Sequence, residues 1–326
     1  MMVVGCITDT MVDDTHLSKE IVFTVSGHFA EQNEISSLVA TDTGNYYYAT
    51  GNQIIKVENA KSTTFSATSE VLVIALNKSD QSLWFGTKSS GLGHYKDGKI
   101  RYYTMESDAL PRNLVHCIAC DEDGAVWFSS SAHRLGGLCC YKNGKIEIFT
   151  PQNAALPDNL IKSISCKDGI VYVATGGTVN QQKMIQIEGN RWKLLPVEGY
   201  YLMGMDVDSE KRLYVIDDTG LSSSMMKPRI WQYENGTIKN IAPDISMFAL
   251  FATLKTDLRN FVWLAKYESN NNVRLTVFDG KTWHDAPADF PDIFIKCMAV
   301  DRNNTVWLGT DQGIYLIKQQ YGFVRH

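Results

Sequence analysis

No run of 18 apolar residues occurs in the 326-residue chain, so no membrane-spanning helix is expected. The chain has fewer basic than acidic residues: it contains 31 Lys and Arg residues and 36 Asp and Glu residues, which gives a formal net charge of −5. Binding to nucleic acid needs a basic face, so we expect no nucleic-acid partner. No glycine-rich loop leads from a strand into a helix, which argues against a nucleotide site at a helix N-terminus.

The most regular feature of the chain is a short phrase, centred on an aromatic residue, that returns every 37 to 49 residues. The seven copies are centred on Tyr47, Trp84, Trp127, Tyr172, Tyr214, Trp263 and Trp307. A period of this length filled with short strand patterns predicts an all-β fold, a seven-bladed β-propeller with four antiparallel strands per blade. Because a closed ring of blades folds as one unit, residues 20–326 are expected to form a single domain.

The second and third copies align position for position over residues 91–100 and 137–146. We name the four strands of each unit a to d, from the axis outwards. A tight Asp/Gly turn joins strands a and b, and strand b carries the aromatic residue. Strands c and d are joined by the strongest hairpin signals, at Asp97-Gly98, Asn143-Gly144, Asn235-Gly236 and Asp279-Gly280.

The seventh copy lacks an outer strand. Its strands a, b and c are predicted at residues 295–300, 305–309 and 314–318, and little sequence follows them. Residues 20–25 have a strand-d pattern and precede the first copy. We therefore predict that the N-terminal strand completes the last blade, which closes the ring and removes an exposed sheet edge.

Seven cysteines are present, but their spacing does not suit a metal site. Cys117 and Cys120 lie three apart in a strand pattern, and residues three apart on a strand point to opposite faces. The adjacent Cys139 and Cys140 fail for the same reason. Cys117 and Cys297 share one column of the repeat, where a small residue suits packing between blades. We expect core thiols, no metal and no other cofactor.

The first 19 residues are polar and acidic after the start, as in a flexible tether. Gly5-Cys6 resembles the end of a bacterial lipoprotein signal, although the charged start and most of the apolar stretch are missing. One hypothesis is that Cys6 is lipidated, so that the protein contacts a membrane only through this lipid. The alternative is an irregular N-terminus on a soluble protein.

Three motifs together resemble the two-component-regulator propeller repeat: Leu-Pro-x-Asn-x-Val, Asp-x-x-Gly-x-x-Trp and Gly-Thr-x-x-Gly-Leu. The second and third copies match well, and the seventh copy matches the second half. Such repeats build the periplasmic sensor halves of hybrid histidine kinases in gut Bacteroidetes, and they also occur as stand-alone proteins. The resemblance implies a sensor-like binding module for glycans in the bacterial periplasm or cell envelope. A cytoplasmic protein is the alternative.

In a propeller, the a–b and c–d turns share one rim, here named the short-turn rim, and the b–c and d–a loops share the other, the long-loop rim. The b–c loops at 129–137, 175–183, 217–229 and 265–274 are long and irregular, as at a binding site. Unconstrained drift of these loops is the alternative. Side chains suited to sugars or peptides there are His133, Arg134, Tyr200, Tyr201, Lys227, Arg229, Tyr267 and Arg274.

A second constellation lies at the start of strand a. The second residue of this strand is His116, Lys162 or Lys296 in three of the blades. Strand a is innermost and begins at the long-loop rim, so these residues would form a basic ring at the mouth of the channel. Concentrated positive charge attracts anions, which predicts an acidic ligand such as a uronate. The alternative is that the lysine side chains simply extend into solvent.

Two enzyme families with propeller folds are alternatives to a binding module. The segment from Asp121 to Trp127 is close to a sialidase Asp box, but it lies in an a–b turn rather than a c–d turn. Streptogramin-type lyases resemble the chain in repeat rhythm, yet their Glu-x-His pair is absent from the sequence. Asp206, Asp217 and Asp218 could converge across the fifth blade, which is a weak signal for acid/base chemistry.

We therefore expect non-catalytic binding of a carbohydrate, acidic or neutral, or of a peptide on the long-loop rim. No catalytic residue is assigned. A polysaccharide lyase or hydrolase with acidic residues at the channel mouth is one alternative. A scaffold that binds another envelope protein is the other.

Overall fold

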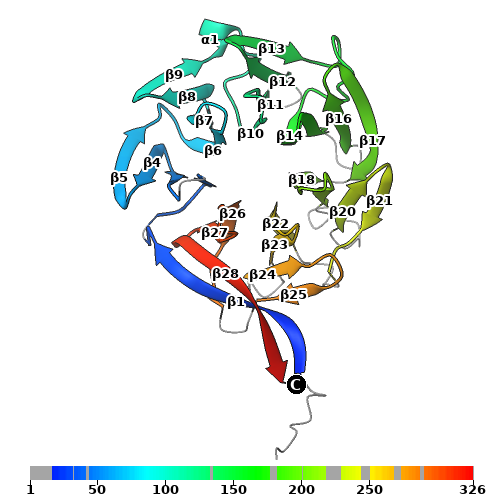
Figure 1. Ribbon diagram of the computed structural model, residues 1–326. Helices are drawn as coiled ribbons and strands as arrows, with labels where there is room; N and C mark the ends of the chain where they lie inside the picture. The colour runs from blue at the N-terminus through cyan, green and yellow to red at the C-terminus, as the bar shows by residue number, and fades with distance from the viewer. Residues whose placement is uncertain are drawn as a thin grey trace, which may run out of the picture.

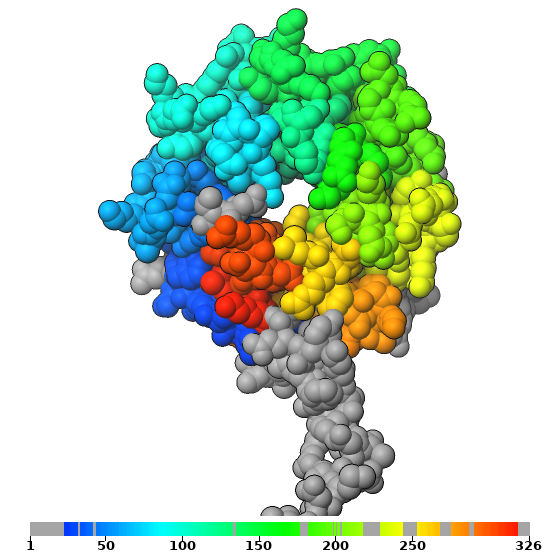
Figure 2. Space-filling view, viewed as in Figure 1, coloured from blue at the N-terminus to red at the C-terminus, as the bar shows by residue number. Residues whose placement is uncertain are grey.

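The computed structural model describes residues 17–31, 33–41, 44–132, 135–176, 182–199, 201–217, 229–243, 250–267, 273–286 and 290–325. Its strands form seven sheets, each of four antiparallel strands, arranged around a central opening (Figures 1 and 2). The predicted seven-bladed β-propeller is confirmed. Among the described residues no helix has the length and apolar character needed to cross a bilayer.

The first four blades follow the chain in order, each from the inner strand outwards. Blade 1 consists of β2 (Ser37–Ala40), β3 (Tyr46–Thr50), β4 (Gln53–Glu58) and β5 (Lys61–Ser66). Blade 2 consists of β6 (Val71–Asn77), β7 (Ser82–Thr87), β8 (Leu92–Lys96) and β9 (Lys99–Tyr103). Blade 3 consists of β10 (Ile118–Cys120), β11 (Val126–Ala132), β12 (Leu135–Lys142) and β13 (Lys145–Phe149). Blade 4 consists of β14 (Ile161–Lys167), β15 (Ile170–Thr175), β16 (Gln182–Glu188) and β17 (Arg191–Gly199).

The remaining blades complete the ring. Blade 5 consists of β18 (Leu202–Val207), β19 (Leu213–Asp217), β20 (Arg229–Glu234) and β21 (Thr237–Asn240). Blade 6 consists of β22 (Leu250–Thr256), β23 (Val262–Tyr267), β24 (Val273–Phe278) and β25 (Trp283–Asp285). Blade 7 consists of β26 (Ile295–Val300), β27 (Val306–Thr310), β28 (Gly313–Arg325) and β1 (Leu17–Phe29). A four-residue helix, α1 (Met105–Asp108), follows blade 2.

Closure by the N-terminal strand is confirmed, because β1 pairs antiparallel with β28 as the outer strand of blade 7. The strand is longer than the predicted 20–25, since it begins at Leu17 and continues past a bulge at Val25/Gly27 to Phe29. It thus includes residues 17–19, which were assigned to the tether. Figure 1 shows the ends of β1 and β28 running beyond the ring as a two-stranded ribbon.

The c–d hairpins explain the regularity of the blades. Asp97-Gly98, Asn143-Gly144 and Asn235-Gly236 all have positive φ at both positions, as the tight hairpin turn requires. The fourth predicted hairpin is wider. Asp279 accepts hydrogen bonds from the backbone of Lys281 and Thr282, both at 2.8 Å, so β25 begins only at Trp283.

The repeat aromatic packs between neighbouring blades. Trp84 is 1% exposed and Trp263 is fully buried. In blades 6 and 7 the Asp that opens the a–b turn accepts a hydrogen bond from the indole: Asp257 from Trp263 at 3.1 Å, and Asp301 from Trp307 at 3.0 Å. In the repeat phrase Asp-x-x-x-x-x-Trp, this hydrogen bond therefore links the a–b turn to the aromatic residue at the blade interface.

Candidate functional site

The innermost strands begin at the long-loop rim with a β-bulge. The pairing register shifts between Ile161 and Ser163 in blade 4, and between Ile295 and Cys297 in blade 7. Lys162 and Lys296 are the extra residues of these bulges. A bulge leaves one residue outside the ladder and redirects its side chain, which is why these positions are free to carry polar groups at the inner edge of the ring.

His116 lies at the equivalent position of blade 3, but it serves the blade interface. Its Nε2 donates to the backbone carbonyl of Ile161 at 2.8 Å, and its Nδ1 lies 3.3 Å from the Ser129 hydroxyl. Burial lowers the pKa of His116. The hydrogen bond to Ile161 opposes this change, and the positive charge of Lys162 adds to it, so that the pKa remains below its ordinary value. His116 is therefore neutral at pH 7 and does not contribute to a basic ring.

The two lysines differ in their environment. Lys296 pairs with Glu34 of the segment before blade 1, and this pairing lowers the pKa of Glu34. Lys162, which is half-buried, has no hydrogen-bond or ion-pair partner among the described residues. The positive charge expected at the channel mouth is thus reduced to one lysine without a partner and one lysine that is balanced by an exposed carboxylate.

Tyr267 and Lys296 are brought together by Phe294, which the sequence patterns did not single out. The ring of Phe294 stacks on Tyr267 with centroids 4.5 Å apart, and the Lys296 Nζ lies 5.9 Å from the Phe294 centroid. Phe294 is 45% exposed, although it is a large apolar residue. Its backbone is held by Asp311, whose carboxylate accepts from the Phe294 N–H at 2.8 Å. Phe294 immediately precedes strand β26, and this position was the only signal in the sequence.

Tyr267 itself is anchored at its other end. Its hydroxyl donates to the carbonyl of Ile295 at 2.9 Å, and burial raises the pKa of the phenol. The Tyr267 ring is therefore a fixed support for the exposed face of Phe294. We call Tyr267, Phe294 and Lys296 the rim platform.

Arg229 and Tyr201 belong to a separate cluster in blade 5. Arg229 pairs with the buried Asp217 at 2.5 Å and lies over the ring of Trp231 at 4.8 Å. The backbone N–H of Tyr201 donates to the same carboxylate at 3.2 Å. His133, Arg134, Tyr200, Lys227 and Cys6 lie outside the described residues, as does the side chain of Arg274.

The expected convergence of acids in blade 5 is wrong. Asp217 pairs with Leu202 at one end of strand β18, whereas Asp206 pairs with Tyr214 near the other end. Asp206 is bound by Lys255 at 2.9 Å and by the Thr256 hydroxyl at 2.7 Å, at the short-turn rim. Asp218 lies outside the described residues. The acid pair that would serve a hydrolase at the channel mouth is therefore not formed by Asp206 and Asp217.

The predicted opposite orientation of Cys117 and Cys120 is confirmed. Cys117 packs in the core between blades 3 and 4, and Cys120 packs in the core between blades 2 and 3, so the two thiols face opposite sides of the sheet. Burial raises the pKa of both thiols to about 12. Within the part of the chain that the structure describes, no cluster of His, Cys, Asp and Glu has the arrangement of a metal site.

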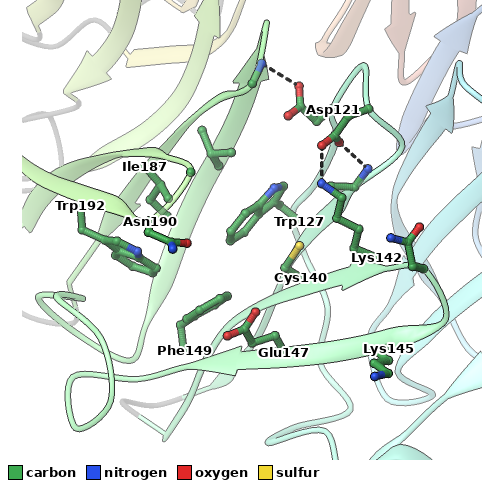
Figure 3. A pocket seen from close by; sticks show the side chains of 16 residues that line it. Asp121, Trp127, Cys140, Lys142, Lys145, Glu147, Phe149, Ile187, Asn190 and Trp192 are labelled. Carbon is green, nitrogen blue, oxygen red and sulfur yellow. Dashed lines mark hydrogen bonds and ion pairs between the residues drawn. The ribbon is translucent and has the colours of Figure 1, made fainter.

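A pocket of about 820 Å³ lies on the opposite rim, between blades 3 and 4 (Figure 3). Trp127, Phe149 and Trp192 line it together with Glu147 and Asn190. The sequence patterns described above do not predict this pocket. The available signal was that Cys140 and Ile187 stand at repeat positions that carry His94 and Tyr141 at the neighbouring interface.

Two stretches of the chain, residues 109–132 and 289–312, match the family model described as two component regulator propeller. The chain carries two-component-regulator propeller repeats. The first stretch runs from the entry to blade 3 through strands β10 and β11. The second runs from the entry to blade 7, which contains Phe294, through strands β26 and β27. No curated protein matches the chain at a significant level.

Solved structures resemble the whole ring. Virginiamycin B lyase from Staphylococcus aureus aligns with a TM-score of 0.71 at 14% identity, over 92% of this chain and 99% of that one. The extracellular domain of a hybrid two-component system from B. thetaiotaomicron aligns with a TM-score of 0.69 at 16% identity, over 92% of this chain and 42% of that one. PorZ, a surface component of the type-IX secretion system of Porphyromonas gingivalis, aligns with a TM-score of 0.65 at 16% identity, over 90% of this chain and 47% of that one. These identities establish the shared fold alone.

Proposed function

We propose that the protein is a non-catalytic, sensor-like module of the bacterial periplasm or cell envelope that binds a carbohydrate at the long-loop rim. The observation that carries the proposal is the exposed Phe294, stacked on Tyr267 with Lys296 beside it. An exposed aromatic face that is backed by a second ring offers a rigid surface for the apolar face of a sugar. The extracellular propeller domain among the similar structures supports the envelope location.

The charge at this rim favours a sugar that carries a carboxylate. Lys296 lies next to the Phe294 ring, and an anionic ligand can displace its exposed partner Glu34. Lys162, without a partner among the described residues, adds positive charge at the inner edge. Such exposed pairs contribute little to stability, so exchanging Glu34 for a ligand carboxylate costs little.

A glycan array tests the proposal directly. We expect the protein to bind acidic oligosaccharides, and we expect Phe294→Ala to abolish this binding without lowering the unfolding temperature. A Lys162→Ala/Lys296→Ala double variant should lose acidic glycans more than neutral ones. Leu258→Ala, which changes a still more exposed apolar residue on the other rim, is the control. Unchanged glycan binding in both variants would refute the rim platform.

The same assay separates the alternatives. Binding to a peptide library but to no glycan would identify a peptide or protein scaffold. Turnover of polysaccharides by the purified protein would identify a lyase or hydrolase. Lipidation of Cys6 is tested independently, since mass spectrometry of the native protein would reveal the mass of an attached diacylglycerol.

A further inference from the structure

The pocket between blades 3 and 4 is lined on two sides by rows of paired side chains. On blade 3, Trp127 lies opposite Cys140, and Cys140 lies opposite Glu147, on adjacent strands β11, β12 and β13. On blade 4, the facing row runs through strands β15, β16 and β17 as Val171, Ile187 and Trp192. All six side chains line the pocket of about 820 Å³ (Figure 3).

The equivalent space between blades 2 and 3 is filled. There, His94 stacks on Trp84 with centroids 4.0 Å apart, and Tyr141 from blade 3 lies 4.7 Å from the same indole. The positions of His94 and Tyr141 in the repeat correspond to Cys140 and Ile187 at the pocket. The pocket therefore arises because two ring-bearing side chains of the repeat are replaced by smaller ones.

Trp127 differs from the other residues of the aromatic column. Its six counterparts are buried, whereas Trp127 is partly exposed. The indole nitrogens of Trp84, Trp263 and Trp307 donate to Ser or Asp side chains, while the Trp127 nitrogen has no partner among the described residues. Asp121, which occupies the bracing position, accepts instead from the backbone N–H of Gly169 in the tight blade 4 turn, at 3.2 Å.

Three aromatic rings form a continuous wall of the pocket. Phe149 is nearly parallel to Trp127, with centroids 5.7 Å apart and an interplanar angle of 21°. Trp192 of blade 4 continues the wall, 5.1 Å from Phe149. Because the rings contact one another along a ridge, they present one extended apolar surface rather than a cage around a small cation.

Polar groups border this wall. Figure 3 places Glu147 and Asn190 beside the rings, and neither has a hydrogen-bond partner among the described residues. Lys142 is already paired with Asp123 at 2.5 Å. The charges of Lys142 and Asp123 cancel in this pair. The remaining charged residues of the lining are two acids, Glu147 and Asp121, and one base, Lys145, so the pocket does not favour an anionic ligand. It offers both a free acceptor and free donors at the edge of an apolar surface.

We propose that this pocket is a second carbohydrate site, on the short-turn rim, that binds a neutral mono- or disaccharide unit. The apolar face of the sugar ring stacks on Trp127, Phe149 and Trp192. Sugar hydroxyls donate to the Glu147 carboxylate and accept from the Asn190 amide and the Trp127 indole. The volume is within the range of small-ligand pockets. This site does not depend on the rim platform.

The test fills the pocket with residues that the same protein uses elsewhere. A Cys140→His/Ile187→Tyr variant reproduces the filled interface of blades 2 and 3. The probes are glucose, galactose, mannose, N-acetylglucosamine, maltose, cellobiose and lactose, titrated by indole fluorescence and saturation-transfer NMR. We expect at least one sugar to bind, the filled variant to lose this binding, and the unfolding temperature to stay the same or rise.

Trp192→Ala is the second variant, in case the filled one does not fold. Because one stacking ring is removed, the affinity for the sugar should fall by about tenfold. Gln186→His is the matched control, because Gln186 holds the position of Cys140 at the next interface and lies outside this pocket. Gln186→His should leave this binding unchanged. Loss of binding in the pocket variants, in which the rim platform is intact, separates the pocket from the rim platform.

Three outcomes would overturn the proposal. Absence of binding by every probe is the first. Equal binding by the wild-type protein and by both pocket variants is the second. The third is saturable binding of tetramethylammonium with no response to sugars, which would show that the aromatic wall serves a cation instead.

Discussion

The indole N–H of Trp263 donates to the buried carboxylate of Asp257 at 3.1 Å, and Asn304 of the next blade donates to the same oxygen at 3.2 Å. One carboxylate thus ties a turn, an aromatic core residue and a neighbouring blade together. Its other oxygen accepts from the backbone N–H groups of Arg259 and Phe261. The repeat motif therefore stabilises both the blade and its interface.

Asp257→Ala should lower the free energy of unfolding by about 2–4 kcal/mol, because several buried donors lose their acceptor at once. Urea denaturation followed by tryptophan fluorescence measures the loss. Asp121→Ala is the matched change in blade 3, where no indole depends on the carboxylate, and it should cost less. Equal losses in the two variants would show that the indole bond contributes nothing.

Ring closure by β1 makes a second prediction. Phe23 is 5% exposed and meets Trp263 edge-on at 5.2 Å, so Phe23→Ala should destabilise the ring by about 3–5 kcal/mol. Val25→Ala, in the same strand but 44% exposed, should change stability by less than about 0.5 kcal/mol. Thermal unfolding of the two variants compares them. A stable Phe23→Ala protein would mean that β1 does not close the ring in solution.

Stability should fall in mild acid through His116. Its folded pKa lies below the ordinary value of 6.5, so the unfolded chain binds the proton more readily. The contribution of His116 is complete above pH 6.5 and is lost as the pH falls below that value. His116→Gln should therefore reduce the slope of unfolding free energy against pH between about pH 7 and pH 5.

Asp121 acts in the opposite direction between pH 3.8 and about pH 6, a range that overlaps the one for His116, and it provides a check. Burial raises its pKa from 3.8 to about 6, so the folded state binds this proton more readily than the unfolded chain. Its ionisation therefore destabilises the protein as the pH rises through that window. Asp121→Asn should steepen the slope that His116→Gln flattens, and an identical change in both variants would contradict the assignment.

The pairing of Lys296 with Glu34 makes a prediction about the rim platform. Glu34→Gln removes the competing carboxylate, so affinity for acidic oligosaccharides should rise several-fold, most clearly at low salt. Glu31→Gln, an exposed acid near the same rim, is the control and should have little effect. Calorimetric titration at two salt concentrations measures the change, and weaker binding by Glu34→Gln would contradict it.

The architecture followed from local patterns. Asp-Gly and Asn-Gly pairs specify tight hairpins, and the recurring aromatic specifies the blade interior, because turn geometry and strand alternation depend on a few adjacent residues. The missing outer strand near residue 318 was enough to predict closure by the N-terminal segment. The opposed faces of Cys117 and Cys120 followed from the two-residue period of a strand.

The sites were decided by contacts between blades. Glu34, which is 262 residues away in sequence, balances the charge of Lys296. The carbonyl of Ile161, in the next blade, accepts a hydrogen bond from His116. Asp206 and Asp217 were expected to converge, yet the register places them at opposite ends of their strands.

By itself, the sequence determined the number of blades and the turns, since each blade and each turn is set by residues close together in the chain. It also predicted the closure, because the last copy of the repeat lacks an outer strand and the N-terminal segment has the pattern of one. The tertiary structure alone decided which charges are balanced, that Phe294 stays exposed on Tyr267, and that the space beside Trp127 is left open. The physical reason is that burial and charge balance are sums over side chains from different blades. The opening beside Cys140 exists only because Ile187, from another blade, is also too small to fill it.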